Sequence, residues 1–165
     1  MSATELANNG APSLDSPDDV RSALAGLGQL SPLDAKGAEA VYVVIRQLYE
    51  HDHFERACSF LQILVSLQPG EARYWFAWGM CLKRLERYEE AVTVLQAAAF
   101  LGHDDGQTSL QIAECQLRSG APANADQTLA DLVERCSDQT QAGEAVRRAM
   151  ALRRLLAKGT GRAEA

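Results

Sequence analysis

Cysteine and histidine have the most versatile chemistry in this chain, because their side chains ligate metals and act as nucleophiles or bases. Successive cysteines are separated by 23, 34 and 21 residues. No CxxC pair is present, and no histidine stands at a zinc-ligand spacing from any cysteine. We therefore expect small buried hydrophobic residues rather than zinc ligands or disulfides at Cys58, Cys81, Cys115 and Cys136.

The three histidines give only weak metal-binding patterns. His51 and His53 lie two residues apart in a predicted turn, a spacing that holds a metal weakly without further ligands. His103 precedes Asp104-Asp105-Gly106, which resembles the start of a calcium loop but lacks its alternating acids and its final glutamate. We expect this tripeptide to form a turn and to cap the following helix.

Motifs for catalysis are missing from the sequence as well. It contains no glycine-rich phosphate loop, no GxSxG and no HExxH. No nucleophile has a nearby base that a helical fold would bring within reach. We therefore expect no metal, no cofactor and no catalytic residue, and we infer a recognition protein rather than an enzyme.

The composition predicts one globular domain. The chain has 165 residues, of which 47% are hydrophobic and 23% charged, ordinary values for a protein that buries a core. Its longest apolar stretches are far shorter than the ~20 residues of a membrane-spanning helix. The N-terminus also lacks the basic and apolar regions of a secretory signal. We expect no stable membrane insertion and no export by that route.

Charge is distributed unevenly along the chain. The net charge of −6 argues against nucleic-acid binding, which needs a basic face. Residues 141–165 nevertheless hold six basic and two acidic residues, a local charge of +4, against −10 for the remainder. This basic segment could bind an anionic partner or the body of a second copy. Alternatively, it forms a solvated terminal helix whose cations complement the negative end of its own dipole.

An internal repeat organises most of the chain. Helical hydrophobic spacing runs from about residue 31 to 135 with short breaks, and no sustained alternation of the kind that strands need is present. Five columns recur with a period of 34 residues: Ala57, Ala91 and Ala125; Leu61, Leu95 and Leu129; Leu64, Ala98 and Leu132; Ile45, Gly79 and Ala113; Phe54, Tyr88 and Pro122. This period and the small residues within it are typical of the tetratricopeptide repeat, a helix–turn–helix unit.

The repeat predicts an all-α solenoid of three helix pairs. We place the pairs at 38–50 with 54–67, 72–84 with 88–101, and 106–118 with 122–135, within repeats 38–71, 72–105 and 106–137. A final helix at 139–157 caps the stack. Residues 1–15 read as a disordered leader, 16–157 as a single domain and 158–165 as a flexible tail. Ser16-Pro17-Asp18-Asp19 predicts the start of a short N-terminal helix over 17–27.

The first helix of each pair is expected to line a concave surface. The second, fifth, ninth and twelfth positions of these helices fall between the core-facing positions, and we call them the groove positions. They are Glu39, Tyr42, Arg46 and Tyr49, then Arg73, Phe76, Met80 and Lys83, then Gln107, Leu110, Glu114 and Leu117. Several are large apolar residues, and such residues along a groove indicate an interaction surface. The alternative is that some are core residues or are covered by a terminal helix, Leu117 above all.

Local strings within the repeats resemble the LcrH/SycD family, the class II chaperones of bacterial type III secretion. These strings are Val41-Tyr42 through Tyr49, Phe54-Glu55-Arg56-Ala57, the stretch Ala72-Arg73-Tyr74-Trp75-Phe76-Ala77-Trp78-Gly79-Met80-Cys81, and Ala113-Glu114-Cys115-Gln116-Leu117. The resemblance covers about residues 31–135. It implies a cytoplasmic bacterial chaperone that binds a hydrophobic, pore-forming translocator protein in its groove, with prolines and leucines of an extended segment as anchors.

The resemblance also implies particular residue roles. Tyr42 and Tyr49 match the family's groove aromatics in kind, whereas Arg46 stands where the family often has Phe, and Asp52 where it often has Gly. The family's members commonly form homodimers through N-terminal helices, which would here place Val20, Leu24 and Leu27 in a dimer interface.

A structural adaptor is the competing interpretation. A repeat module that grips the C-terminal carboxylate of a heat-shock chaperone is disfavoured because Glu114 would repel that carboxylate. A needle-subunit chaperone within a secretion apparatus remains open as the second hypothesis.

Overall fold

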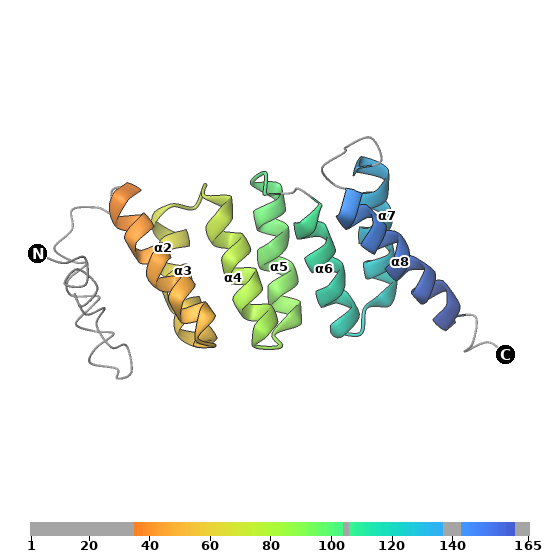
Figure 1. Ribbon diagram of the computed structural model, residues 1–165, viewed down its shortest axis with the longest axis horizontal. Coiled ribbons are helices and arrows are strands. Elements are labelled where there is room, and N and C mark those ends of the chain that lie inside the picture. Colours follow the sequence, from red (N-terminus) through yellow and green to blue (C-terminus); the bar gives the residue numbers. More distant parts are fainter. Residues whose placement is uncertain (1–34, 104–105, 137–142, 161–165) are drawn as a thin grey trace, which may run out of the picture. The chain divides into compact units, whose positions relative to one another are not determined.

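In the computed structural model the described residues are 35–103, 106–136 and 143–160, and the regular structure within them is entirely helical. The helices are α2 (Ala35–Glu50), α3 (Phe54–Leu67), α4 (Ala72–Arg84), α5 (Tyr88–Phe100), α6 (Gln107–Arg118), α7 (Pro122–Cys136) and α8 (Gly143–Thr160) (Figure 1). The chain separates into two compact units, residues 1–41 and 42–165, so α2 begins in the first unit and ends in the second.

The expected all-α fold of three helix pairs and a final helix is confirmed. The helices α3 and α4 have the predicted bounds, α2 begins three residues earlier at Ala35, and α8 continues to Thr160 rather than ending at 157. The predicted leader, the N-terminal helix over 17–27 and its residues Val20, Leu24 and Leu27 lie outside the described residues. None of the described helices combines the length and the apolar character needed to cross a membrane.

Successive helices pack against one another in chain order from α3 to α8, and α8 also contacts α6. The close approach of α4 to α5 depends on one residue, Gly79. A Cβ atom on Gly79 would lie 2.5 Å from Cγ of Leu95, a side chain that is fully buried. Only glycine permits this approach, which explains why the small-residue column of the repeat carries Gly79 in its middle copy.

The same turn closes all three helix pairs. Asp52, Glu86 and Gly120 are spaced by 34 residues, and each has a positive φ, of 60°, 59° and 82°. In each turn the next amide donates back across the helix end, for example from His53 N to Leu48 O and from Ala121 N to Gln116 O. This is the usual left-handed helix ending. The usual glycine stands at this place only in the third turn, whereas Asp52 and Glu86 adopt the left-handed conformation themselves in the first two.

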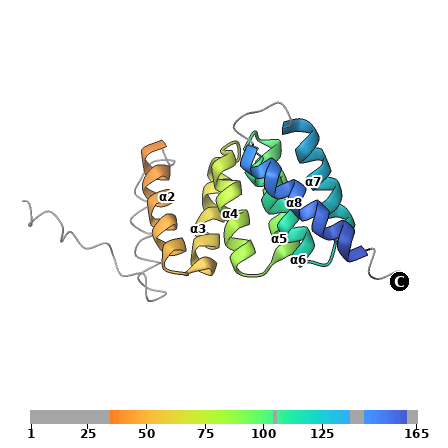
Figure 2. The same cartoon turned by 45° about the vertical axis from the view of Figure 1, so that its right-hand side comes forward.

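The C-terminal part of the stack has its own core. Its buried members come from α6, α7 and α8: Leu110, Ala113, Ala125, Leu129, Leu132, Cys136 and Ala149. Val146, Leu152 and Leu156 of α8 pack on this cluster as well. Figure 2 shows α8 lying across α6 and α7, as a capping helix should.

Candidate peptide-binding groove

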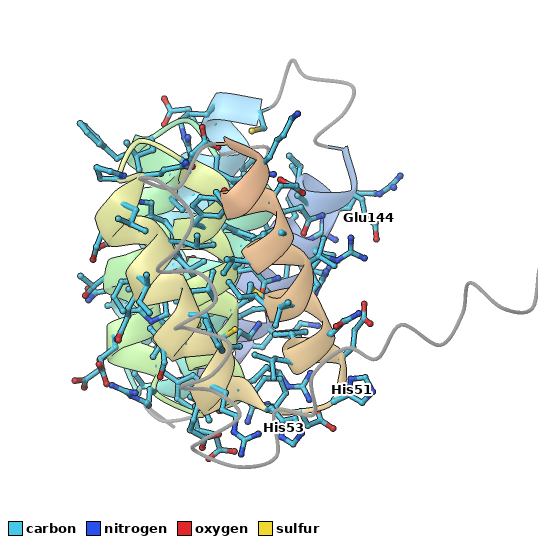
Figure 3. The ribbon with its side chains drawn as sticks, turned by 90° about the vertical axis from the view of Figure 1, so that its left-hand side faces the viewer. His51, His53 and Glu144 are labelled. Atoms are coloured by element: carbon cyan, nitrogen blue, oxygen red, sulfur yellow. The ribbon has the colours of Figure 1, made fainter. Side chains whose placement is uncertain are left out.

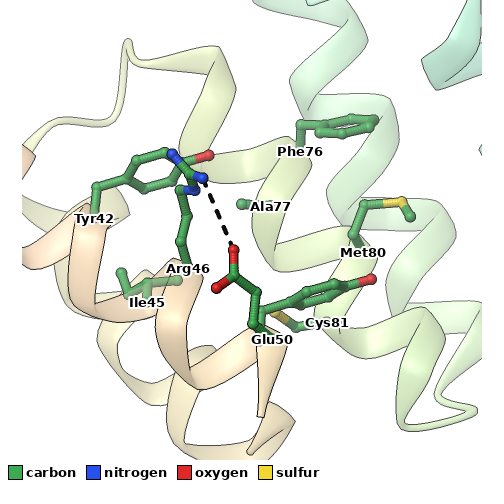
Figure 4. A pocket seen from close by; sticks show the side chains of 9 residues that line it. Tyr42, Ile45, Arg46, Glu50, Phe76, Ala77, Met80 and Cys81 are labelled. Carbon is green, nitrogen blue, oxygen red and sulfur yellow. Dashed lines mark ion pairs between the residues drawn. The ribbon is translucent and has the colours of Figure 1, made fainter. Parts of the chain in front are cut away.

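An open apolar pocket lies between α2 and α4, within the second unit. It has a volume of about 300 Å³. The residues that line it are Tyr42, Ile45, Arg46, Tyr49, Glu50, Phe76, Ala77, Met80 and Cys81 (Figure 4). Five of these are predicted groove positions, so the repeat register brings Tyr42, Arg46, Tyr49, Phe76 and Met80 together around one cavity.

Tyr42 is positioned by the start of α4. Its ring centroid lies 5.4 Å from that of Tyr74, a fully buried core residue. The guanidinium of Arg73 lies 5.2 Å from the Tyr42 ring and 4.9 Å from the Tyr74 ring, and its Nη2 donates to the Tyr74 hydroxyl at 3.0 Å. Arg73, itself a predicted groove residue, thus stacks on the pocket's tyrosine instead of lining the pocket.

Tyr49 is held in a similar way at the other end of α2. Its ring meets the Phe54 ring edge-on at 5.2 Å, with an interplanar angle of 71°. Arg84 lies over both rings, 5.7 Å from the Tyr49 centroid and 4.4 Å from that of Phe54, and pairs with Asp52 at 3.0 Å. Aromatic and cationic contacts therefore hold both tyrosines in place, and both residues also line the pocket.

Phe76 is supported by the loop before the third repeat. Its ring stacks on His103 with centroids 4.4 Å apart and planes 18° from parallel. Nδ1 of His103 lies 3.1 Å from the hydroxyl of the fully buried Thr108, and that hydroxyl also donates to the His103 carbonyl. His103 therefore contacts a pocket residue, a role that the sequence analysis did not assign to it.

The floor of the pocket is uncharged. Ile45 and Cys81 are almost fully buried there, at 2% and 1% exposure. The Cys81 thiol donates a hydrogen bond to Cys58, and together with burial this raises the pKa of Cys81 and keeps its thiol neutral. Four lining residues were not predicted as site residues: Ile45, Glu50, Ala77 and Cys81. The first three lie one helical turn from a groove position and could have been found by that spacing, whereas Cys81 is adjacent to Met80 and no such spacing points to it.

A charged pair stands at the mouth of the pocket. Arg46 Nη2 lies 3.8 Å from Glu50 Oε1 on the same helix, and both side chains are well exposed, at 69% and 62%. Such a pair is worth little in energy and is easily rearranged. This exposed charged pair lines the pocket beside its apolar residues (Figure 4).

The predicted groove does not continue along α6 as an apolar surface. Leu110 is fully buried in the C-terminal core, so its assignment to the groove is wrong. Leu117 is only partly buried, and it packs against the same cluster. The physical reason is α8, whose buried Ala149 belongs to the same cluster and whose packing on α6 covers the surface that the repeat alone would have left open.

Polar residues occupy the groove face beside this core. Nζ of Lys83 contacts Glu114 Oε2 and Gln111 Oε1, each at 2.5 Å, and Arg148 of α8 contacts Glu114 Oε1 at 2.9 Å. Lys83 and Glu114 are about three-quarters buried, with side-chain exposures of 22% and 24%. The second half of the groove face is therefore an ion cluster that ties α4, α6 and α8 together, and Arg148 is a member that sequence reasoning did not identify.

The histidines and cysteines do not form a metal or catalytic site within the part of the chain that the structure describes. His51 and His53 lie exposed in the turn after α2 (Figure 3), where Nδ1 of His51 is 2.7 Å from the Gln47 carbonyl. No group of three possible metal ligands occurs among the described residues. All four cysteines are buried and free, as their spacing predicted.

Comparison with known proteins places this geometry in a structural context. The sequence matches no protein-family model and no curated protein at a significant level. Solved structures do match the fold. SycD of Yersinia enterocolitica in complex with a peptide of the translocator YopD has a TM-score of 0.71 at 19% identity, covering 79% of this chain and 99% of SycD.

Two further solved structures match to a similar degree. PcrH in complex with the chaperone binding region of PopD has a TM-score of 0.72 at 22% identity, covering 80% of this chain and 99% of PcrH. A type III secretion complex from Aeromonas hydrophila has a TM-score of 0.72 at 18% identity, covering 87% of this chain and 98% of that one. At these identities the likeness shows the tetratricopeptide-repeat fold of stacked helix pairs.

Proposed function

We propose that this protein is a bacterial cytoplasmic chaperone of type III secretion that binds an extended segment of a hydrophobic translocator protein before export. The observation that carries the proposal is the open apolar pocket between α2 and α4, whose aromatic residues are held in place by contacts with neighbouring rings. Two structures of the same fold, SycD and PcrH, are complexes with segments of translocators, YopD and PopD.

The pocket fits an apolar anchor of such a segment. Its volume of about 300 Å³ and uncharged floor accept one or two aliphatic side chains. Each buried Leu-sized side chain contributes roughly 1.5–3 kcal/mol, part of which is offset by ordering the segment. One or two such side chains contribute about 6 kcal/mol at most, short of the ~8 kcal/mol of micromolar binding, so tighter binding of a segment needs contacts elsewhere on the chaperone. No catalytic step is part of the proposal.

Co-expression tests the proposal directly. A translocator from the same organism is produced with the wild-type chain or with the double variant Tyr42→Ala/Phe76→Ala, and soluble translocator is measured. The matched control is Val43→Ala/Phe100→Ala, which shortens two exposed apolar side chains (46% and 90% exposed) outside the pocket. We expect the wild type and the control to keep the translocator soluble and the pocket variant to lose most of it.

Two results would contradict this function. A folded pocket variant that protects the translocator as well as the wild type does would show that the pocket is not the binding site. Recovery of a small helical needle subunit, with no large apolar cargo, would favour the second hypothesis of a needle-subunit chaperone.

A further inference from the structure

The outward side of α8 is basic and partly apolar. Arg147, Arg154 and Lys158 follow one another along the helix at spacings of seven and four residues, so they form one exposed row. Met150 and Leu155 flank this row on its two sides, with exposures of 41% and 65%. We call these five residues the α8 ridge.

The ridge is distinct from the residues that hold α8 in place. Those that pack on the core lie on the other side of the helix and are Ala145, Val146, Ala149, Leu152 and Leu156. The other two cations of the helix are engaged, Arg148 with Glu114 at 2.9 Å and Arg153 with Asp126 at 2.7 Å. Within the described residues no ion pair joins an acidic side chain to the cations of the ridge, so neither the fold nor the pocket uses them.

The dipole of α8 does not explain this row of cations. A helix dipole stabilises a cation only near the last turn, and Lys158 is the basic residue in the last turn of α8. Arg147 lies near the start of the helix, towards the positive end of the dipole, and Arg154 lies before the last turn. A helix whose cations complement its own dipole therefore accounts for Lys158 alone.

The charge of the chain is concentrated on this helix. Residues 143–160 hold five basic residues against the single acid Glu144, a charge of +4, and the whole chain has −6, so the remainder has −10. Charges are screened over ~8 Å at physiological ionic strength. Acids elsewhere on the protein therefore weaken the attraction of the ridge for an anionic surface without cancelling it, and such a surface meets the protein at α8.

The shape of the ridge favours a flat partner. Its cations span eleven residues, or about 16 Å along the helix. Seen down the helix axis, Met150 lies about 60° from Arg147 on one side and Leu155 about 80° on the other. A second convex surface, such as an acidic helix, would reach the central cations and miss one of the two flanks. A deformable plane reaches the cations and both apolar side chains together.

We propose that the α8 ridge is a docking site for an anionic membrane surface. Such a surface presents phosphates that need no fixed register with Arg147, Arg154 and Lys158, and an apolar layer beneath them that Met150 and Leu155 can reach. Three cations and two apolar side chains give weak, reversible binding, and no helix has to cross the bilayer. This inference is independent of the pocket and of its ligand.

Flotation of the full-length chain with lipid vesicles tests the contact. We expect the wild type to float with vesicles of phosphatidylglycerol and phosphatidylethanolamine at about 0.05 M NaCl, to be released by about 0.5 M NaCl, and not to float with phosphatidylcholine vesicles. Arg147→Gln/Arg154→Gln should lower partitioning onto the anionic vesicles about 25-fold, because each cation near the surface contributes roughly a factor of five. Leu155→Gln should lower it by a smaller factor, because it removes one apolar contact.

A control of equal net charge separates the ridge from general electrostatics. Lys36→Gln/Arg118→Gln removes the same two charges at exposed positions outside α8 and should bind as the wild type does. Circular dichroism checks that each variant is folded. The proposal is overturned by a wild type that does not bind anionic vesicles at low salt, or by a ridge variant that binds as well as the control. Ridge-dependent binding of polyglutamate without binding of vesicles would also overturn it, because the partner would then be an acidic protein.

Discussion

The groove positions fall into two halves: those that line the pocket between α2 and α4, and those that lie beside the C-terminal core in α6 and its ion cluster. The two halves differ in what covers them. Phe76 and Leu110 occupy the same repeat position, yet Phe76 lines an open pocket whereas Leu110 is fully buried. Met80 and Glu114 likewise share a position, and the first lines the pocket while the second lies in an ion cluster with Lys83. The difference is produced by α8, which packs on α6. Position within a repeat sets the direction of a side chain, and the neighbouring helix decides whether that side chain stays accessible.

The largest predicted effect is on the free energy of unfolding, which should fall more for a substitution in the second half of the groove face than for one in the first half. Leu110→Ala should lower the free energy of unfolding by about 2–5 kcal/mol, because it leaves a cavity in a closed core. Phe76→Ala should cost clearly less, because the Phe76 ring is only partly buried and already faces an open pocket. Urea unfolding followed by circular dichroism measures both. Equal losses in the two variants would show that the halves do not differ as described.

The second prediction separates the halves by binding. Met80→Ala should weaken the affinity for a translocator segment roughly 10-fold, because at least about 1.4 kcal/mol of apolar contact is lost from the pocket. Leu117→Ala should leave that affinity unchanged while it lowers stability, because Leu117 packs against the C-terminal core. Fluorescence anisotropy with a labelled segment compares the two. Weakening by Leu117→Ala alone would move the binding site to the second half.

The positions of the helix pairs and most of the pocket residues are predictable from the sequence, whereas the burial of Leu110 is not. The period of 34 residues locates every hairpin turn, and it brings Tyr42, Phe76 and Met80 to one cavity. Leu110 was misassigned because periodicity treats each repeat as if it had identical neighbours. The exposure of a residue in the last repeat depends on the helix that follows the array, and the spacing within the array does not describe that helix.

The sequence analysis also could not predict which side chains contact the aromatic rings of the pocket, because these contacts do not follow from helical spacing. The stacking of His103 on Phe76 brings a loop residue onto a helix residue. The positions of Arg73 over the Tyr42 ring and of Arg84 over the Tyr49 ring depend on the rotamers of these arginines. No spacing rule fixes these contacts. A pocket residue can therefore be predicted by helical position, whereas the group that holds its ring in place cannot.

The third prediction concerns the ion cluster of the second half. Glu114→Gln should lower the free energy of unfolding by about 1 kcal/mol, because it leaves Lys83 and Arg148 without the charge that both contact. Affinity at the pocket should not change, because Glu114 does not line it. The matched control is Glu50→Gln, which removes the exposed partner of Arg46 and should have almost no effect on stability. An equal loss in both variants would argue that the cluster adds nothing to the packing of α8.

The smallest predicted effect depends on pH and concerns how α8 is held on α7. Hydrogen bonding from Arg153 holds the pKa of the Asp126 carboxyl below its usual value. A carboxyl whose pKa is lower when folded stabilises the fold at pH above its unfolded pKa of ~3.9, and this contribution is lost as the pH falls through the folded pKa. The midpoint temperature of Arg153→Ala should therefore lie slightly below that of the wild type at neutral pH and approach it below about pH 4. A carbon-detected NMR titration of the Asp126 carboxyl should show its pKa rising in the variant, since the donor that favours the charged form is gone. A pKa that is identical in both proteins would mean that this pair does not fasten α8, and that apolar packing alone closes the second half of the groove face.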